Sequence, residues 1–153
     1  MCVRVKLSAE IEIESSPESY FKCLKEELHH LPNAASRVHG FEFHEDEFNT
    51  QGSVKSWTYT LVGKDETFKE RFEIDEANCS VSMIAVGGHM LERFKSYKII
   101  CKVIRVSTDK PAATVKGTLV YEKHQESDTE VFKEFEFMIT MLKDLDKNLF
   151  LGK

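Results

Sequence analysis

The sequence lacks the features that mark several common classes of protein. It has four cysteines, Cys2, Cys23, Cys79 and Cys101, and no CxxC pair, so neither a metal knuckle nor a dithiol redox motif is indicated. A secreted scaffold held together by disulfides would be shorter and richer in cysteine. The first residues alternate apolar and polar side chains and contain no apolar run, so we expect no signal peptide. These absences favour a reducing compartment, and we expect a cytoplasmic protein.

Long apolar runs and an excess of basic residues are also missing. No stretch approaches the ~20 apolar residues of a membrane-spanning helix, so no membrane span is expected. Asp and Glu outnumber Lys and Arg by 26 to 21, which gives a formal net charge of −5. Nucleic acids and anionic membranes attract basic surfaces. We therefore expect no nucleic-acid partner, and RNA binding at physiological salt should be negligible.

Glycine is scarce in the loop that could have bound a phosphate. The stretch "FNTQGSVKSW" at 48–57 lies between two alternating apolar runs and contains only Gly52. A phosphate-binding loop usually needs several glycines, with a helix start or a lysine behind them. We interpret the stretch as the turn of a hairpin. No HExxH motif or other cluster of ligand residues is evident, so neither a metal nor a cofactor is expected.

The first part of the chain predicts a strand followed by two short helices. Odd-numbered residues from Val3 to Ile13 are apolar and the even-numbered ones polar, which is typical of a half-buried strand. Ser16 is a good N-cap and Pro17 a good first helical residue, so a helix is predicted over about 17–29. Pro32 ends it, and "NAASRV" could form a second short helix.

The middle of the chain predicts an antiparallel meander of six more strands. The segments are "HGFEFHE", "VKSWTYTLV", "ETFKERFEI", "CSVSMIAV", a run from Met90 to about Val106, and "ATVKGTLVYEK". Turns are expected at Gly63-Lys64, at 75–78, at Gly87-Gly88 and at 108–111, the glycine pair suiting a tight hairpin. Apolar parity changes within the run that starts at Met90, which indicates a bulge near Lys95.

The end of the chain changes to a helical period. Ser127 and Glu130 match a capping box, and an apolar stripe then continues for about twenty residues. The stripe contains Val131, Phe135, Met138, Leu142, Leu145 and Leu149 and is widened by Phe132 and Ile139. A helix this long would lie across a sheet. Residues 1–153 are thus expected to form a single α+β domain, a seven-stranded curved antiparallel sheet around a long C-terminal helix. A curved sheet cannot touch a straight helix everywhere, so an internal cavity is expected.

Several stretches resemble the plant major latex protein group of the birch-pollen-allergen superfamily, which has a helix-grip, START-like fold. They are "GSVKSW" (52–57), "IDEANCSV" (74–81), "GGHMLERFKSYKI" (87–99), "LVYEK" (119–123) and "ITMLKDLDKNLF" (139–150). The resemblance covers essentially the whole chain. Two departures are Asn49, where the family usually has a glycine, and His89, where it usually has an acidic residue.

The resemblance implies an intracellular plant protein, a monomer or weak dimer, that holds a small hydrophobic ligand in its cavity. The ligand would be an apolar or amphipathic metabolite of lipid, terpenoid, steroid or alkaloid type, and the role would be in defence or specialised metabolism. A few relatives catalyse cyclisations or isomerisations. The alternative is therefore a cofactor-free cyclase or isomerase that acts in the same cavity. We favour the carrier, because nothing in the sequence demands catalysis.

Strand parity and the helical stripe indicate which residues face the cavity. The expected ligand-binding residues are Phe41, Phe43, Trp57, Tyr59, Phe72, Tyr97, Phe135, Met138, Ile139 and Leu142. In an enzyme, an inward polar residue would move the proton, and the candidates are His39, Tyr59 and Glu70. Each has a plainer alternative: Tyr59 as a core tyrosine, and His39 as a solvated residue at the start of a strand. A buried Glu70 must pair with an arginine or lysine, unless its parity is misjudged.

Overall fold

The computed structural model describes residues 3–26, 38–45, 52–61, 63–105, 113–124 and 131–151, with the backbone alone for 41–45, 150 and 151. Four expectations lie wholly or mostly outside these residues. They are the second short helix at "NAASRV", the start of the loop at 48–51, the turn at 108–111, and the capping box of Ser127 and Glu130.

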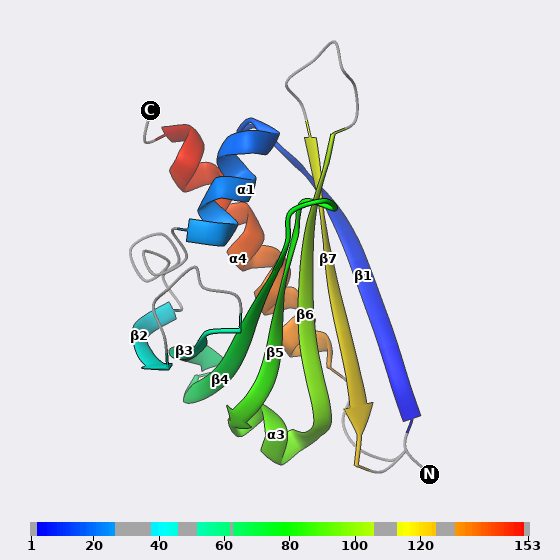
Figure 1. The fold of residues 1–153 in the computed structure, drawn as a ribbon. Coiled ribbons are helices and arrows are strands. Elements are labelled where there is room, and N and C mark those ends of the chain that lie inside the picture. Colours follow the sequence, from blue (N-terminus) through cyan, green and yellow to red (C-terminus); the bar gives the residue numbers. More distant parts are fainter. Residues whose placement is uncertain are drawn as a thin grey trace.

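The described chain forms one seven-stranded antiparallel sheet that curves around a long helix (Figure 1). The strands are β1 (Val3–Ile13), β2 (Val38–Glu45), β3 (Val54–Leu61), β4 (Lys64–Asp75), β5 (Ser80–Gly88), β6 (Phe94–Arg105) and β7 (Ala113–Lys123). Their order in the sheet is β1-β7-β6-β5-β4-β3-β2. The helices are α1 (Pro17–Glu26), α3 (His89–Arg93) and the twenty-residue α4 (Phe132–Leu151). The predicted strands, meander and terminal helix are confirmed.

The segment from Gly87 to Arg93 differs from its prediction. Gly87 and Gly88 do not form the turn; they end β5, opposite Lys69 and Phe68 of β4. The chain then makes one short helix, α3, and β6 begins only at Phe94. The prediction of a strand for 90–93 is therefore wrong. Residues four apart, such as Met90 and Phe94, lie on the same side of a strand and also of a helix, so their spacing does not distinguish the two.

The predicted bulge in β6 is confirmed. The register between β6 and β7 shifts between Phe94 and Ser96, so Lys95 is the extra residue. Phe94 and Tyr97 are both buried on the concave side, and their rings stack with centroids 5.5 Å apart. A bulge of one residue lets two side chains of opposite parity face the same way.

The corner between β1 and α1 is anchored to α4. Ser16 caps α1, because its hydroxyl accepts the N–H of Ser19 at 3.1 Å, as its sequence position predicts. The carboxylate of Asp146 on α4 accepts the backbone N–H groups of Glu14 and Ser15, each at 2.9 Å. The Tyr20 hydroxyl donates to a carbonyl of α4, that of Leu142, at 2.8 Å. These contacts hold α4 across the sheet and so position the site described below.

We expect Asp146→Ala to lower the free energy of unfolding by about 1–3 kcal/mol, because two backbone N–H groups, one of them partly buried, lose a charged acceptor. Asp144→Ala is the matched control on the same helix, since Asp144 makes no hydrogen bond or ion pair within the described part of the chain. Urea denaturation followed by circular dichroism measures both. Equal losses in the two variants would show that the anchor does not stabilise the fold.

Candidate functional site

A pocket lies between the concave face of the sheet and α4. Strand residues that line it include Val38, Leu61, Ile99 and the aromatic residues Trp57, Tyr59, Phe68 and Tyr97, and α4 adds Phe137. Four of the chain's five methionines, Met83, Met90, Met138 and Met141, complete the apolar wall. Two carboxylates, Glu70 and Glu134, also belong to the lining, although the surface open to the pocket is almost entirely carbon.

The pocket is small in this structure. Its free volume is about 50 Å³, where one water molecule needs ~10–15 Å³. Sites for drug-sized ligands usually have ~300–1,000 Å³. A ligand larger than one small ring would therefore have to displace side chains. Methionine has three rotatable bonds and adapts readily to a new neighbour, so a wall rich in methionine suits such a displacement.

Side chains of α4 pack tightly against the sheet at one glycine of β7, Gly117. A Cβ atom added at Gly117 would lie 2.8 Å from Met138 Cε and 2.9 Å from Leu142 Cδ1. The pocket lies on the other side of the sheet's concave face, where side chains of β3 to β6 line it together with α4.

Side chains alternate between the two faces of β3 and β4, so residues that lie opposite each other on the two strands face the same way. Trp57 lies opposite Phe68, and Tyr59 lies opposite Glu66. Aromatic contacts link these strands to β6 and to α4: the ring centroids of Phe68 and Tyr97 of β6 lie 5.7 Å apart, edge to face, and those of Tyr59 and Phe137 of α4 lie 5.2 Å apart. Such contacts fix the orientation of large side chains around a small space.

Four of the ten residues expected to bind a ligand line this pocket: Trp57, Tyr59, Tyr97 and Met138. Four others lie outside the lining. Phe72 and Leu142 are buried in the core outside the lining, whereas Phe135 and Ile139 are half-buried and pack against the core. The side chains of Phe41 and Phe43 lie outside the described residues. Ligand contact remains a prediction for all ten.

Glu134, Phe137 and Met141 were missed on α4. They line the pocket together with Met138, at the helical spacing i, i+3, i+4 and i+7. The pocket therefore faces a stripe turned slightly from the predicted one, and Phe132, assigned to that stripe, is 66% exposed. The spacing of Glu134, Phe137, Met138 and Met141 could have revealed this face, but a glutamate at its first position hid it.

Of the three candidate catalytic residues, Tyr59 and Glu70 reach the pocket and His39 does not. The register between β2 and β3 shifts between Val38 and Gly40, so His39 is an extra residue and turns outward while Val38 turns inward. The His39 imidazole is 46% exposed and lies 3.9 Å from Asp65. The parity that placed His39 inside is wrong, and its plainer alternative, a solvated residue at the strand start, is correct.

Glu70 is fully buried and pairs with a lysine across the ladder. Lys55 lies opposite Glu70; both side chains are 0% exposed, and Lys55 Nζ lies 4.0 Å from Glu70 Oε2. The Lys55 ammonium also lies 3.7 Å from the centre of the Phe72 ring, and Trp57 Nε1 donates to Glu70 Oε1. Burial raises the pKa of Glu70 to about 7, against the opposing effects of Lys55 and Trp57. The expectation that a buried Glu70 pairs with a cation is confirmed.

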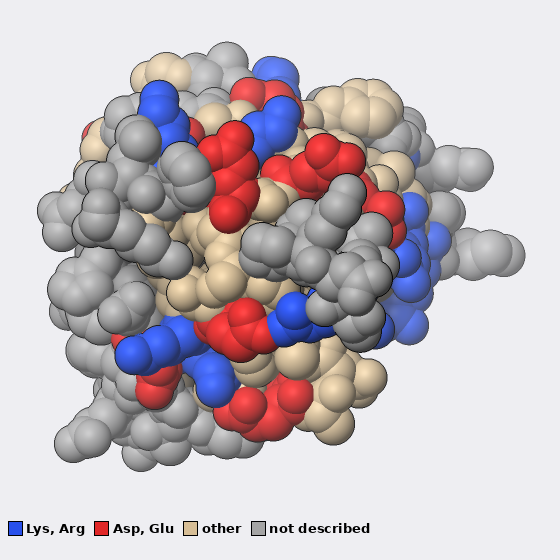
Figure 2. All heavy atoms as spheres, turned by 90° about the horizontal axis from the view of Figure 1, so that it is seen from above, with Lys and Arg blue, Asp and Glu red and all other residues tan. Residues whose placement is uncertain are grey.

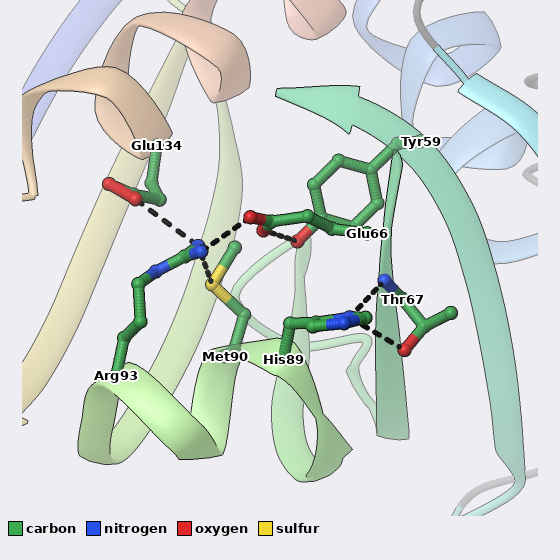
Figure 3. A network of polar contacts seen from close by, with 7 residues as sticks. All are labelled: Tyr59, Glu66, Thr67, His89, Met90, Arg93 and Glu134. Carbon is green, nitrogen blue, oxygen red and sulfur yellow. Dashed lines mark hydrogen bonds and ion pairs between the residues drawn. The ribbon is translucent and has the colours of Figure 1, made fainter. Parts of the chain in front are cut away.

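A second polar cluster joins α3 to β4 and to the first turn of α4 (Figure 3). Arg93 lies 2.5 Å from Glu66 Oε2 and 3.3 Å from Glu134 Oε1. The Tyr59 hydroxyl donates to Glu66 at 3.3 Å. Burial, the nearby carboxylate of Glu66 and its hydrogen bond raise the pKa of Tyr59 well above its ordinary value despite Arg93, so this hydroxyl stays protonated. The cluster places a neutral donor and two carboxylates beside the pocket.

Residues 52–57, the described part of the stretch that could have been a phosphate-binding loop, continue the sheet. Gly52 N–H donates to the carbonyl of Phe72 at 2.8 Å, and the Phe72 N–H donates to the carbonyl of Ser53 at 2.9 Å. The N–H group of Gly52 is therefore already bonded to β4, next to the first pair of the β3–β4 ladder. This confirms that residues 52–57 belong to a strand and its turn.

The surface shows mixed charge. Figure 2, which views the molecule from above, shows acidic and basic side chains interspersed over this end. Such a pattern differs from the broad basic surface that favours nucleic-acid binding. Among the described residues, no helix is long and apolar enough to cross a membrane.

Comparison with known proteins agrees with this architecture. A model of the pathogenesis-related protein Bet v 1 family matches residues 2–151. MLP-like protein 328 of Arabidopsis thaliana is 32% identical over 141 residues and is matched over 92% of either chain. The crystal structure of ginseng major latex-like protein 151 from Panax ginseng superposes with a TM-score of 0.87 at 28% identity, covering 95% of this chain and 97% of that one.

More distant structures share the fold alone. A norcoclaurine synthase point mutant from Thalictrum flavum, solved with a transition-state analogue, superposes with a TM-score of 0.81 at 16% identity over 99% of this chain and 98% of that one.

The whole-length family match and the similarity to latex-type relatives assign the chain to a family. It belongs to the pathogenesis-related protein Bet v 1 family and, within it, to the plant major latex proteins.

Proposed function

We propose that this protein binds a small apolar or amphipathic metabolite, of lipid, terpenoid, steroid or alkaloid type, in the pocket between the sheet and α4. The carbon-lined pocket itself carries the proposal. An apolar pocket with a few convergent polar groups is the usual form of a small-molecule site. The ligand-binding fold of the family supports it. A cytoplasmic carrier in plant defence or specialised metabolism fits these properties.

Filling the pocket should abolish binding without unfolding the protein. We expect Met138→Trp to weaken binding of an apolar fluorescent probe at least about tenfold, because the indole takes the space that the ligand needs. Phe132→Trp is the matched control, since it adds the same group to α4 at a position that is 66% exposed. Fluorescence titration measures both, with circular dichroism to confirm folding. Unchanged affinity in Met138→Trp would contradict the proposed site.

The second candidate is a cofactor-free cyclase or isomerase. It is favoured by Glu70, a buried carboxyl in the pocket lining with a pKa of about 7, because a general base works best when its pKa is near the working pH. A proton-transfer enzyme should lose ~10²–10⁴ in turnover in Glu70→Gln or Tyr59→Phe while still binding ligand. A carrier should change only in affinity. Native mass spectrometry of the protein from plant tissue would identify the compound for such assays.

A further inference from the structure

The charged groups around the pocket do not balance. Three carboxylates, Glu66, Glu70 and Glu134, are accompanied by two cations, Lys55 and Arg93. Glu70 and Glu134 belong to the pocket lining, whereas no lysine, arginine or histidine from the described part of the chain does. The interior of a protein screens charge weakly. A bound ligand therefore experiences a net negative environment.

The excess charge is located at one end of the pocket. Glu70 has its own buried cation in Lys55. Glu134 instead shares Arg93 with Glu66, and the guanidinium lies closer to Glu66, at 2.5 Å, than to Glu134, at 3.3 Å. Figure 3 shows this arrangement, with Arg93 between the two carboxylates. The Glu134 end is therefore the electronegative end.

Glu134 also has one carboxylate oxygen that accepts no hydrogen bond from the described residues. Its side chain is 7% exposed, and its Oε2 atom is buried without a hydrogen-bond partner among the described residues. A buried carboxylate oxygen that lacks a donor is destabilising, because it has given up its hydrogen bonds to water. Glu134 is also one of the residues that line the pocket.

We propose that the pocket selects ligands that carry a protonated amine, seated at the Glu134 end, over ligands of the same shape that carry a carboxylate. This inference rests on the proposed binding function. An ammonium group supplies the donor that Glu134 Oε2 lacks within the described part of the chain and neutralises the excess charge. Tyr59 and Tyr97 also line the pocket, and aromatic rings attract cations. A carboxylate would add a fourth negative charge with no cation in the described lining.

The titration behaviour of the site agrees with this geometry. Burial is the largest cause of the raised pKa of Glu134, and Arg93 opposes it only in part. A ligand cation would favour the charged form of Glu134, whereas a ligand anion would oppose it further.

Three probes with the same ring system test the inference. Indane is neutral, 2-aminoindane is cationic and indane-2-carboxylate is anionic at pH 7. Their dissociation constants can be measured by NMR titration of protein labelled with ¹³C at the methionine methyl groups, because four methionines line the pocket. We expect the amine to bind at least about tenfold more tightly than the carboxylate, with indane between them.

Variants that each remove one negative charge show which carboxylate causes the preference for the amine. Glu134→Gln should reduce the amine-to-carboxylate ratio several-fold, and so should Glu66→Gln, which leaves Arg93 to Glu134 alone; the second variant serves if the first does not fold. Glu136→Gln is the control, since Glu136 lies exposed on the same helix and should leave the ratio unchanged. If indane fails to shift the lining methyls, the binding function itself is wrong. If indane binds but the amine has no advantage, or Glu136→Gln lowers the ratio as much as Glu134→Gln, the charge selection alone is overturned.

Discussion

Gly88→Ala should lower the free energy of unfolding by about 3 kcal/mol or more. Gly88 has φ 88° and ψ −172°, a region that essentially only glycine adopts and that costs other residues ~1–3 kcal/mol. A Cβ atom here would also lie 2.5 Å from the carbonyl oxygen of Thr67 and 3.2 Å from the N atom of Lys69. These are backbone atoms of the paired strand, so they cannot turn aside as a flexible side chain would.

Gly63→Ala separates the two causes of lost stability, backbone strain and the steric contact of the added Cβ atom. Gly63 also has a positive φ, 76°, but a Cβ atom there has no neighbour within 4 Å. We expect it to lose only about 1–2 kcal/mol, from backbone strain alone. For a domain of this size, Gly88→Ala should then lower the melting temperature by roughly 10 °C and Gly63→Ala by less than half of that. Equal shifts would show that the contact with Thr67 is relieved by movement of β4.

Breaking the pair of Lys55 and Glu70 should be at least as costly. Both side chains are 0% exposed, so each single variant, Lys55→Met or Glu70→Gln, leaves a buried partner without its counterion, at a cost of ~3–5 kcal/mol. The double variant removes both charges and should be less destabilised than the sum of the single variants by at least about 2 kcal/mol. Urea denaturation of the four proteins at pH 7.5 gives this coupling energy. Additive losses would show that the two groups act independently.

The pair also predicts a pH dependence of stability. Burial raises the pKa of Glu70 from 4.5 to about 7, so between these values the folded protein holds a proton that the unfolded chain has released. The stabilising contribution of this group is complete below pH 4.5 and is lost as the pH rises through 7, a change of about 3 kcal/mol. The difference in unfolding free energy between the natural protein and Glu70→Gln should fall over that interval. A flat difference would mean that Glu70 titrates normally.

Lys55 acts in the opposite direction. Burial lowers its pKa from 10.5 to about 8, although the attraction of Glu70 limits the shift. Its contribution is complete above pH 10.5 and is lost as the pH falls through 8. The two groups together therefore make their smallest contribution between about pH 7 and 8, and stability should rise on both sides of that interval.

Patterns within single stretches of the sequence predicted the strands and the helix, because alternation and helical repeats depend on neighbouring residues only. A half-buried strand must alternate, and a helix that covers a sheet must repeat its apolar face, so β1, the meander and α4 could be recognised. Even the bulge at Lys95 was indicated, because Phe94 and Tyr97 can face the same core only if one residue is added between them. Each of these features lies within a single stretch of chain.

Features that depend on two distant stretches were not predicted. The outward turn of His39 follows from a register shift between β2 and β3, which no pattern within β2 reveals. Lys55 shares parity with Trp57, but its burial is tolerable only because Glu70 lies opposite on another strand. The size of the pocket depends on how α4 rests at Gly117. Packing across elements decides all three.

The pairing of β1 with β7 has a consequence for how the protein is made. Val3 lies opposite Lys123 and Ile13 opposite Ala113, while Glu14 and Ser15 bond to Asp146 near the end of the chain. Ribosomes produce the N-terminal residues first, at ~5–20 residues per second. Strand β1 is thus without its partner until the residues of β7, about 100 positions later, have been synthesised. During that interval its hydrogen-bonding edges and its apolar face are open to other nascent chains, and long-range pairing of this kind is slow. A chaperone that covers β1 during synthesis would therefore protect the newborn protein from aggregation.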